Sequence, residues 1–174
     1  DFTGQCCGMP FKSKGMLKEA EQKREATENQ LSKLSLNGQY PILFDTSPCK
    51  SILSEDDNAN SSLKIYEPVG FIEDVLAKHL TFNATDESIM LHVTCTSRKM
   101  GLTDKMISLA NRCSIQVNIP EHIYCFGFAG DKGFTVPELN ANALASLKEQ
   151  VPSCCSQGYS NSRTCEIGLT EHAG

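Results

Sequence analysis

The chain has 174 residues, a formal net charge of −5 and 40% hydrophobic residues, which is enough length and apolar content to build a folded core. The acidic balance offers no basic patch of the kind that nucleic-acid-binding domains use, which argues against nucleic acid as a partner. No apolar run approaches the roughly 18 residues that a membrane-spanning helix needs, so we expect no transmembrane segment.

The expected elements alternate between helices and short apolar strands. In chain order we expect a helix over 13–36, a strand over 41–44, a helix over 47–53, a polar loop over 54–62, a strand over 63–66, a helix over 68–80, strands over 89–93 and 115–117 with a helix around 103–110 between them, a helix over 137–151 and a last helix containing Cys165. This alternation predicts an α/β fold with mainly parallel strands and flanking helices.

Two cysteine-containing phrases occur twice. Residues 6–16 (CCGMPFKSKGM) resemble residues 125–134 (CFGFAGDKGF). Residues 46–53 (TSPCKSIL) resemble residues 162–169 (SRTCEIGL). The offsets nearly agree, since 125 − 6 = 119 and 165 − 49 = 116. Features that repeat in order at almost one period indicate a duplicated unit. We therefore expect one unit over 1–62 and a second over 63–174.

The nine cysteines admit three kinds of chemistry. A disulfide framework suits shorter secreted chains, and an odd count leaves one thiol unpaired. A closed zinc site needs four ligands, but the close C-x₂-C spacings typical of zinc modules are missing. The third possibility, which we favour, is that the cysteines are reduced and bind a metal centre of another kind. The disulfide framework and the zinc site stay open as alternatives.

The expected positions of the cysteines support this interpretation. Cys49, Cys95 and Cys165 follow strands of a parallel sheet, where ligands collect. Cys49 and Cys165 also fall in the first turn of a helix, whose dipole favours thiolate. Adjacent cysteines cannot face one site from a regular strand. The glycine after each of the two cysteine phrases therefore predicts a turn that delivers sulfur to the site.

These residues resemble a known domain. Cys6-Cys7-Gly8, the Cys125-x-Gly127 phrase and the single cysteines at 49, 95 and 165 resemble the duplicated cysteine-rich CCG domain of heterodisulfide reductases and of related iron–sulfur proteins. The longer phrases CCGMPFKSKG, DTSPC, FGFAGDKGF and GYSNSRTCEIGL are similar to the C-terminal region of respiratory D-lactate dehydrogenases that contain FAD and iron–sulfur clusters. The resemblance covers nearly the whole chain.

The resemblance implies two ligand groups for an iron–sulfur cluster of the [4Fe–4S] kind. One group is Cys6, Cys7 and Cys49, and the other is Cys95, Cys125 and Cys165. Two departures accompany it. The leading cysteine of the first unit would fall before residue 1, since 95 − 119 = −24, and Phe126 stands where the family has the second cysteine of the pair.

The implied function is an electron-transfer module of an FAD-linked oxidoreductase that passes electrons to quinone. The FAD and ferredoxin-type domains would precede this chain, which opens without a starting Met and reads as a fragment that is inactive alone. The expected location is the cytoplasm, with peripheral contact at the inner face of the membrane. The alternatives are a cluster-free docking or structural domain, and the equivalent module of a glycolate or glycerol-3-phosphate dehydrogenase.

The remaining candidates have plainer interpretations. We expect Cys113 to be a buried apolar residue and His92 to lie in the core or behind the ligands. The other expectations are loop thiols at Cys154 and Cys155, basic side chains beside the motifs at Lys132 and Arg163, and a turn residue at Asp131.

Overall fold

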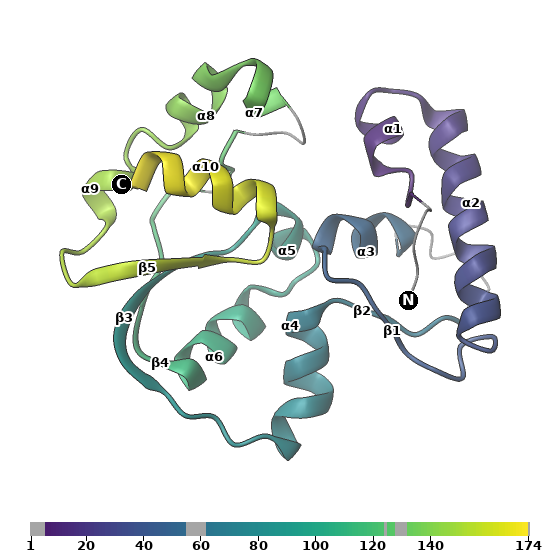
Figure 1. Ribbon diagram of the computed structural model, residues 1–174, viewed down its shortest axis with the longest axis horizontal. Coiled ribbons are helices and arrows are strands. Elements are labelled where there is room, and N and C mark those ends of the chain that lie inside the picture. Colours follow the sequence, from purple (N-terminus) through teal and green to yellow (C-terminus); the bar gives the residue numbers. More distant parts are fainter. Residues whose placement is uncertain (1–5, 55–61, 124, 128–131, 174) are drawn as a thin grey trace. The chain divides into compact units, whose positions relative to one another are not determined.

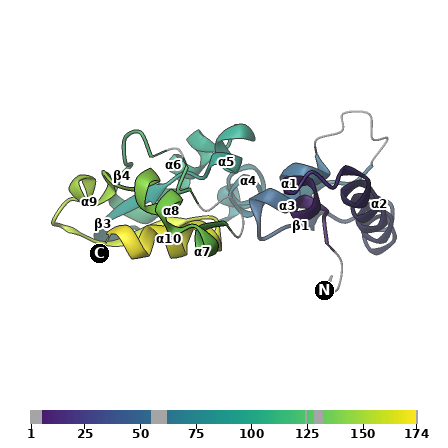
Figure 2. The ribbon, with the colours of Figure 1, turned by 90° about the horizontal axis from the view of Figure 1, so that it is seen from above.

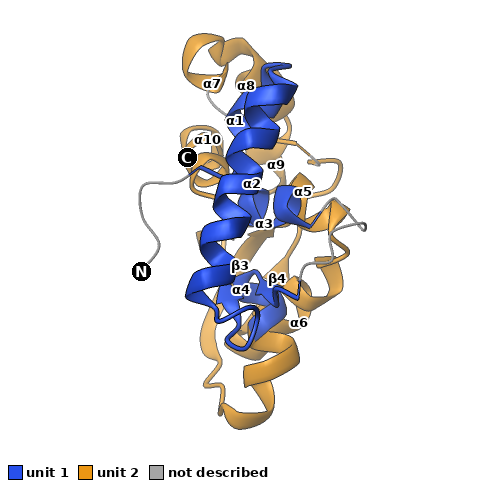
Figure 3. Ribbon diagram, turned by 90° about the vertical axis from the view of Figure 1, so that its right-hand side faces the viewer, with its two compact units in different colours: residues 1–71 blue, residues 72–174 orange. Residues whose placement is uncertain are grey.

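The computed structural model describes residues 6–54, 62–123, 125–127 and 132–173. The chain is mixed α/β, with two small sheets of parallel strands and flanking helices (Figure 1), which confirms the predicted fold class. It divides into two compact units, Asp1–Phe71 (unit 1) and Ile72–Gly174 (unit 2), coloured separately in Figure 3. The repeat in the sequence predicts a division after residue 62. The packed boundary lies later because the strand at 65–66 pairs within unit 1.

Unit 1 contains four helices and a two-stranded sheet among its described residues. Its elements are α1 (Met9–Ser13), α2 (Leu17–Leu34), β1 (Ile42–Leu43), α3 (Ser47–Leu53), β2 (Ile65–Tyr66) and α4 (Pro68–Phe71). β1 and β2 are parallel, with Ile42 opposite Ile65. The single helix expected over 13–36 is therefore wrong at its beginning. Gly15, in the left-handed region at φ +78°, separates α1 from α2.

Helix α2 provides the buried wall of unit 1. Ala20, Thr27 and Leu31 are its buried residues and recur at near-helical spacing on one face. Leu31 packs into an apolar cluster with Cys7 and with Ile52 of α3. The helix ends as the sequence predicted, because Asn37 and Gly38 both adopt positive φ. The turn at Cys6-Cys7-Gly8, called the first cysteine turn below, is thus held between α2 and α3.

Unit 2 is built on a three-stranded parallel sheet of order β4–β3–β5. Its elements are η1 (Ile72–Leu76), η2 (Ala77–His79), β3 (Thr85–His92), α5 (Cys95–Lys99), α6 (Thr103–Cys113), β4 (Ser114–Asn118), α7 (Lys132–Thr135), α8 (Pro137–Ala143), α9 (Leu147–Gln150), β5 (Cys155–Ser160) and α10 (Arg163–Ala173). The central strand β3 carries the apolar run that predicted it, and its last four residues are buried.

The connections cover both faces of this sheet. The chain moves from β3 to β4 on one side and then crosses to β5 on the other. Right-handed crossovers in opposite directions put their helices on opposite faces. Figure 2 shows α5 and α6 on one side of β3 and α10 on the other. The three strands therefore end at one edge, with helices above and below it.

Three details of unit 2 differ from expectation. Strand β5 was not predicted, because it lies at the sheet edge and its sequence CSQGYS is polar and mostly exposed. The helix expected over 137–151 breaks into α8 and α9 at residues 144–146. Cys113 is exposed rather than buried. Its carbonyl accepts from Thr85 Oγ1 at 3.3 Å, so its backbone, and not its thiol, is bonded to β3.

Candidate thiol sites in the two units

The first cysteine turn is fixed by a glycine and by helix α2. Gly8 has φ +91°, and a Cβ at this position would collide with the carbonyl oxygen of Ala20. The hydroxyl of Thr27 donates to the carbonyl of Cys6 over 3.0 Å. No residue other than glycine fits this close approach without a shift of backbone. The turn therefore leaves the Cys7 side chain buried and the Cys6 side chain half-buried.

Cys7 and Cys49 come together in unit 1 from positions 42 residues apart. Cys49 is the third residue of α3, which follows β1. The Cys7 thiol donates to Cys49 Sγ with the two sulfur atoms 3.2 Å apart. A disulfide requires about 2.05 Å, so the two are separate thiols in close contact. Both cysteines are free.

This contact shifts the pKa values of the two thiols in opposite directions. The hydrogen bond from Cys7 lowers the pKa of Cys49 to about 6, with a smaller lowering from Thr46 and with burial acting against both. The pKa of Cys7 is raised, first by that same hydrogen bond and then by burial. Charge on Cys6 also raises the pKa of Cys7, so Cys6 lies within electrostatic reach. The pair holds one proton near neutral pH, as a thiol bonded to a thiolate.

In unit 2 three cysteines follow the three parallel strands. Cys95 begins α5 after β3, Cys125 lies between β4 and α7, and Cys165 is the third residue of α10 after β5. The strands are in parallel register, with Met90 opposite Asn118 and His92 opposite Ser160. Their carboxyl ends therefore share one edge, which Cys95 and Cys165 both follow.

The electrostatics of Cys165 are opposite to those of Cys49. Burial raises its pKa to about 11, although hydrogen bonds from Ser162 and Ser160 act in the other direction. Charges on Cys95 and Cys125 raise it further, so both thiols lie within electrostatic reach of Cys165. Cys165 is thus a protonated thiol at neutral pH.

The second cysteine turn repeats the geometry of the first. Gly127 has φ +79°, and its Cβ would collide with the carbonyl oxygen of Leu139. The contact spans the same number of residues in both units, since 20 − 8 = 12 and 139 − 127 = 12. The amide of Gly127 donates to Cys125 Sγ at 3.4 Å. Asn140 Nδ2 donates to the carbonyl of Phe126.

Phe126 occupies the position equivalent to Cys7 and is part of an apolar core. It packs in one cluster with Cys165 and three other residues, namely Ile123, Leu144 and Leu147. Its ring lies edge-on to the imidazole of His92, with 6.5 Å between ring centroids. An aromatic ring cannot donate a proton to sulfur. Cys165 therefore lacks the interaction that lowers the pKa of Cys49.

The two thiol groups fit a metal cluster differently. Soft thiolates are the ligands that iron–sulfur centres use, and the Cys7–Cys49 pair of unit 1 has one thiolate ready and a second thiol in contact with it. In unit 2 the buried Cys165 retains its proton and Cys125 is exposed. Among the described residues, no three His, Cys, Asp or Glu side chains are arranged to hold a metal ion. The two units therefore differ in that unit 1 holds two thiols in direct contact, while within the described residues neither unit brings three such ligands together.

The other candidate residues lie apart from these groups. Cys154 is exposed. Cys155, expected in a loop, begins β5, where its sulfur lies 3.1 Å from Ser88 Oγ and accepts from Asn118 Nδ2 at 3.2 Å. Nothing in its polar surroundings signalled a strand. Arg163 pairs with Glu166 at 2.5 Å. Lys132 begins α7, and Asp131 lies outside the described residues.

The helices show no membrane-crossing character. Within the part of the chain that the structure describes, every helix is too short or too polar to span a bilayer. Comparison with known proteins gave no assignment: no family model, curated protein or solved structure matches this chain.

Proposed function

We propose that this chain is an iron–sulfur electron-transfer module of an FAD-linked oxidoreductase of the D-lactate dehydrogenase type. The observation that carries the proposal is the contact of Cys7 with Cys49, because it places a thiolate and a thiol together from distant parts of the chain. The repeat of the same turn in unit 2 adds support, since it fits the duplicated domain that the sequence resembles.

Within this proposal the residues of unit 1 have distinct roles. Cys7 and Cys49 would be two of the ligands, and the half-buried Cys6, whose charge acts on Cys7, would be the third. Bound, the cluster would supply one-electron transfer, and hydrogen bonds to its sulfurs would tune its potential. Thr46, which already lowers the pKa of Cys49, is placed to stabilise the thiolate.

Anaerobic reconstitution with iron and sulfide tests the proposal. We expect the 174-residue chain to retain iron and sulfide and to give an EPR signal on reduction. Cys7→Ser and Cys49→Ser should each lose most of the bound iron. Cys113→Ser is the matched control, because Cys113 is exposed and belongs to neither thiol group. A colourless chain without iron would contradict the proposal. Equal amounts of iron in the unmutated chain and in all three variants would contradict it as well.

Unit 2 supports a second candidate, a cluster-free docking or structural role. The specific observation is that Phe126 stands where the resembled domain has a cysteine ligand, and its side chain is part of the apolar core. The variant Phe126→Cys separates the two roles within unit 2. If unit 2 fails to bind a cluster only because it lacks a thiol at position 126, the variant binds iron and the pKa of Cys165 falls. If unit 2 is purely structural, the variant loses stability and gains no iron.

The wider assignment belongs to the same proposal. The partners are the FAD and ferredoxin-type domains of the parent protein and a quinone of the respiratory chain, at the cytoplasmic face of the membrane. D-lactate is the substrate by resemblance of the sequence phrases, and glycolate or glycerol-3-phosphate is the alternative. Assaying the full parent enzyme with each of the three substrates distinguishes these possibilities.

A further inference from the structure

Unit 2 contains a cavity that the thiol groups do not use. It lies between β5, α9 and α10 and has a volume of about 210 Å³. Its apolar walls are Met90, Pro120, Leu147, Val151, Leu169 and Ala173. A dry cavity of about 150 Å³ accommodates benzene. The space in unit 2 therefore suits a molecule of the size of one substituted ring.

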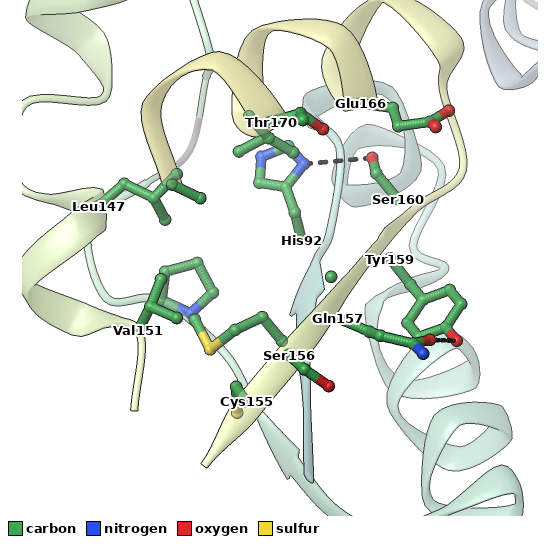
Figure 4. A pocket seen from close by; sticks show the side chains of 15 residues that line it. His92, Leu147, Val151, Cys155, Ser156, Gln157, Tyr159, Ser160, Glu166 and Thr170 are labelled. Atoms are coloured by element: carbon green, nitrogen blue, oxygen red, sulfur yellow. Dashed lines mark hydrogen bonds between the residues drawn. The ribbon is translucent and has the colours of Figure 1, made fainter. Parts of the chain in front are cut away.

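His92 is the buried polar residue that carries the argument, in a lining that also includes Ser156, Gln157, Ser160, Glu166 and Thr170. It is 4% exposed, and its Nδ1 lies 3.4 Å from Ser160 Oγ. Its Nε2 is buried and has no hydrogen-bond partner among the described residues. Figure 4 shows Nδ1 directed at Ser160 and the opposite ring nitrogen turned towards the side of Leu147. A buried nitrogen left unbonded costs about 1–3 kcal/mol, which a ligand atom would recover.

The charge around the cavity limits what it can bind. The imidazole is neutral at pH 7, because burial and then the positive charge of Arg98 lower the pKa of His92 to about 4. The charged side chain in the lining is the carboxylate of Glu166, which is paired with Arg163. An anionic ligand would therefore meet no free positive charge among the lining residues and would be repelled by the carboxylate.

We propose that this cavity binds an uncharged, ring-sized molecule carrying one hydroxyl or carbonyl group, which hydrogen-bonds to His92 Nε2. A ligand hydroxyl fits either tautomer of His92. When Ser160 donates to Nδ1, Nε2 carries the proton and donates to the ligand hydroxyl; when Nδ1 donates to Ser160, the ligand hydroxyl donates to Nε2. Because Nε2 is itself buried, binding requires a lining side chain to move aside and admit the ligand oxygen.

Phenol, toluene and benzoate are suitable probes because they share one ring and differ in the polar group. We expect amide NMR shifts on adding phenol to the whole chain, concentrated at Gly158, Ser160 and Ala173. Benzoate should produce none. In the variant His92→Phe, which keeps a ring of similar size, the affinity ratio of phenol to toluene should fall at least about fivefold.

A second variant covers the possibility that His92→Phe does not fold. Val151→Trp fills the cavity from the end of α9 and should abolish binding of phenol and toluene while the spectrum elsewhere is retained. The proposal is overturned if phenol shifts no cavity residue at millimolar concentration. It is also overturned if Val151→Trp binds phenol as well as the parent chain, or if the phenol-to-toluene ratio is unchanged in a folded His92→Phe protein.

Discussion

Unit 1 and unit 2 place different side chains on the same backbone turn. Gly8 and Gly127 share a positive φ and the same close approach to a carbonyl 12 residues later. The preceding residue is a thiol in unit 1 and a phenyl ring in unit 2. Cys49 and Cys165 are each the third residue of a helix, with a hydroxyl three residues earlier that lowers the thiol pKa.

The residue before the glycine contributes to the difference between the two thiol environments. Cys7 donates to Cys49 and lowers its pKa to about 6, whereas Phe126 contributes only burial to the cluster around Cys165, whose pKa rises to about 11. The comparison indicates that the glycine turn fixes where a side chain goes. The chemistry at that place depends on whether the delivered side chain can share a proton.

The largest expected effect is on the packing of unit 2. Phe126→Ala should lower the free energy of unfolding by about 3–5 kcal/mol, because it opens a cavity in the core around Leu144 and Cys165. Cys7→Ala at the equivalent place should cost about 1 kcal/mol. Urea unfolding of the two variants gives the measurement. Equal losses would mean that the two turns have the same role.

The glycine turns come next. Gly8→Ala and Gly127→Ala should each cost on the order of 3 kcal/mol, because positive φ strains the alanine and its Cβ meets a carbonyl oxygen. Gly15→Ala and Gly101→Ala are matched controls: both have positive φ but no atom within 4 Å of the added Cβ. Those should cost about 1–2 kcal/mol, from strain alone. Urea midpoints that do not separate the two pairs would contradict the close approach.

Acid should destabilise unit 2 through His92, while unit 1 contains no histidine. The folded-state pKa of His92 is about 4 and its ordinary value is 6.5. The unfolded chain therefore takes up a proton at a higher pH than the folded chain. This contribution, on the order of 3 kcal/mol, is complete above pH 6.5 and is lost as the pH falls to 4. Hydrogen exchange followed by mass spectrometry resolves the two units, and His92→Phe should remove the acid dependence from unit 2.

The smallest effect concerns thiol reactivity. At about pH 7.5 Cys49 is mostly thiolate and Cys165 is almost wholly protonated, but a thiolate of low pKa is also a weaker nucleophile. We expect iodoacetamide to modify Cys49 at least about tenfold faster than Cys165, with the Cys49 rate half-maximal near pH 6. Peptide mapping measures both. In Cys7→Ala the half-maximal pH for Cys49 should rise, and an unchanged value would exclude the proton-sharing contact.

Much of the fold could be predicted from local pattern. The apolar run before His92 predicted the central strand, Asn37-Gly38 predicted the end of α2, and Ser47-Pro48 predicted the start of the helix carrying Cys49. These features depend on neighbours along the chain, so spacing and residue type suffice. Strand β5 was missed for the converse reason: an edge strand needs no apolar alternation, and its pairing with β3 is a long-range interaction.

The amino-acid sequence by itself determined the α/β class and that Cys49 and Cys95 would each follow a strand. Tertiary structure alone decided that Cys7 reaches Cys49 at 3.2 Å, that Cys113 faces solvent and that His92 keeps one nitrogen unbonded beside a cavity. The physical reason is that proton sharing and burial depend on which side chains meet across the fold, and those partners lie tens of residues away in the chain.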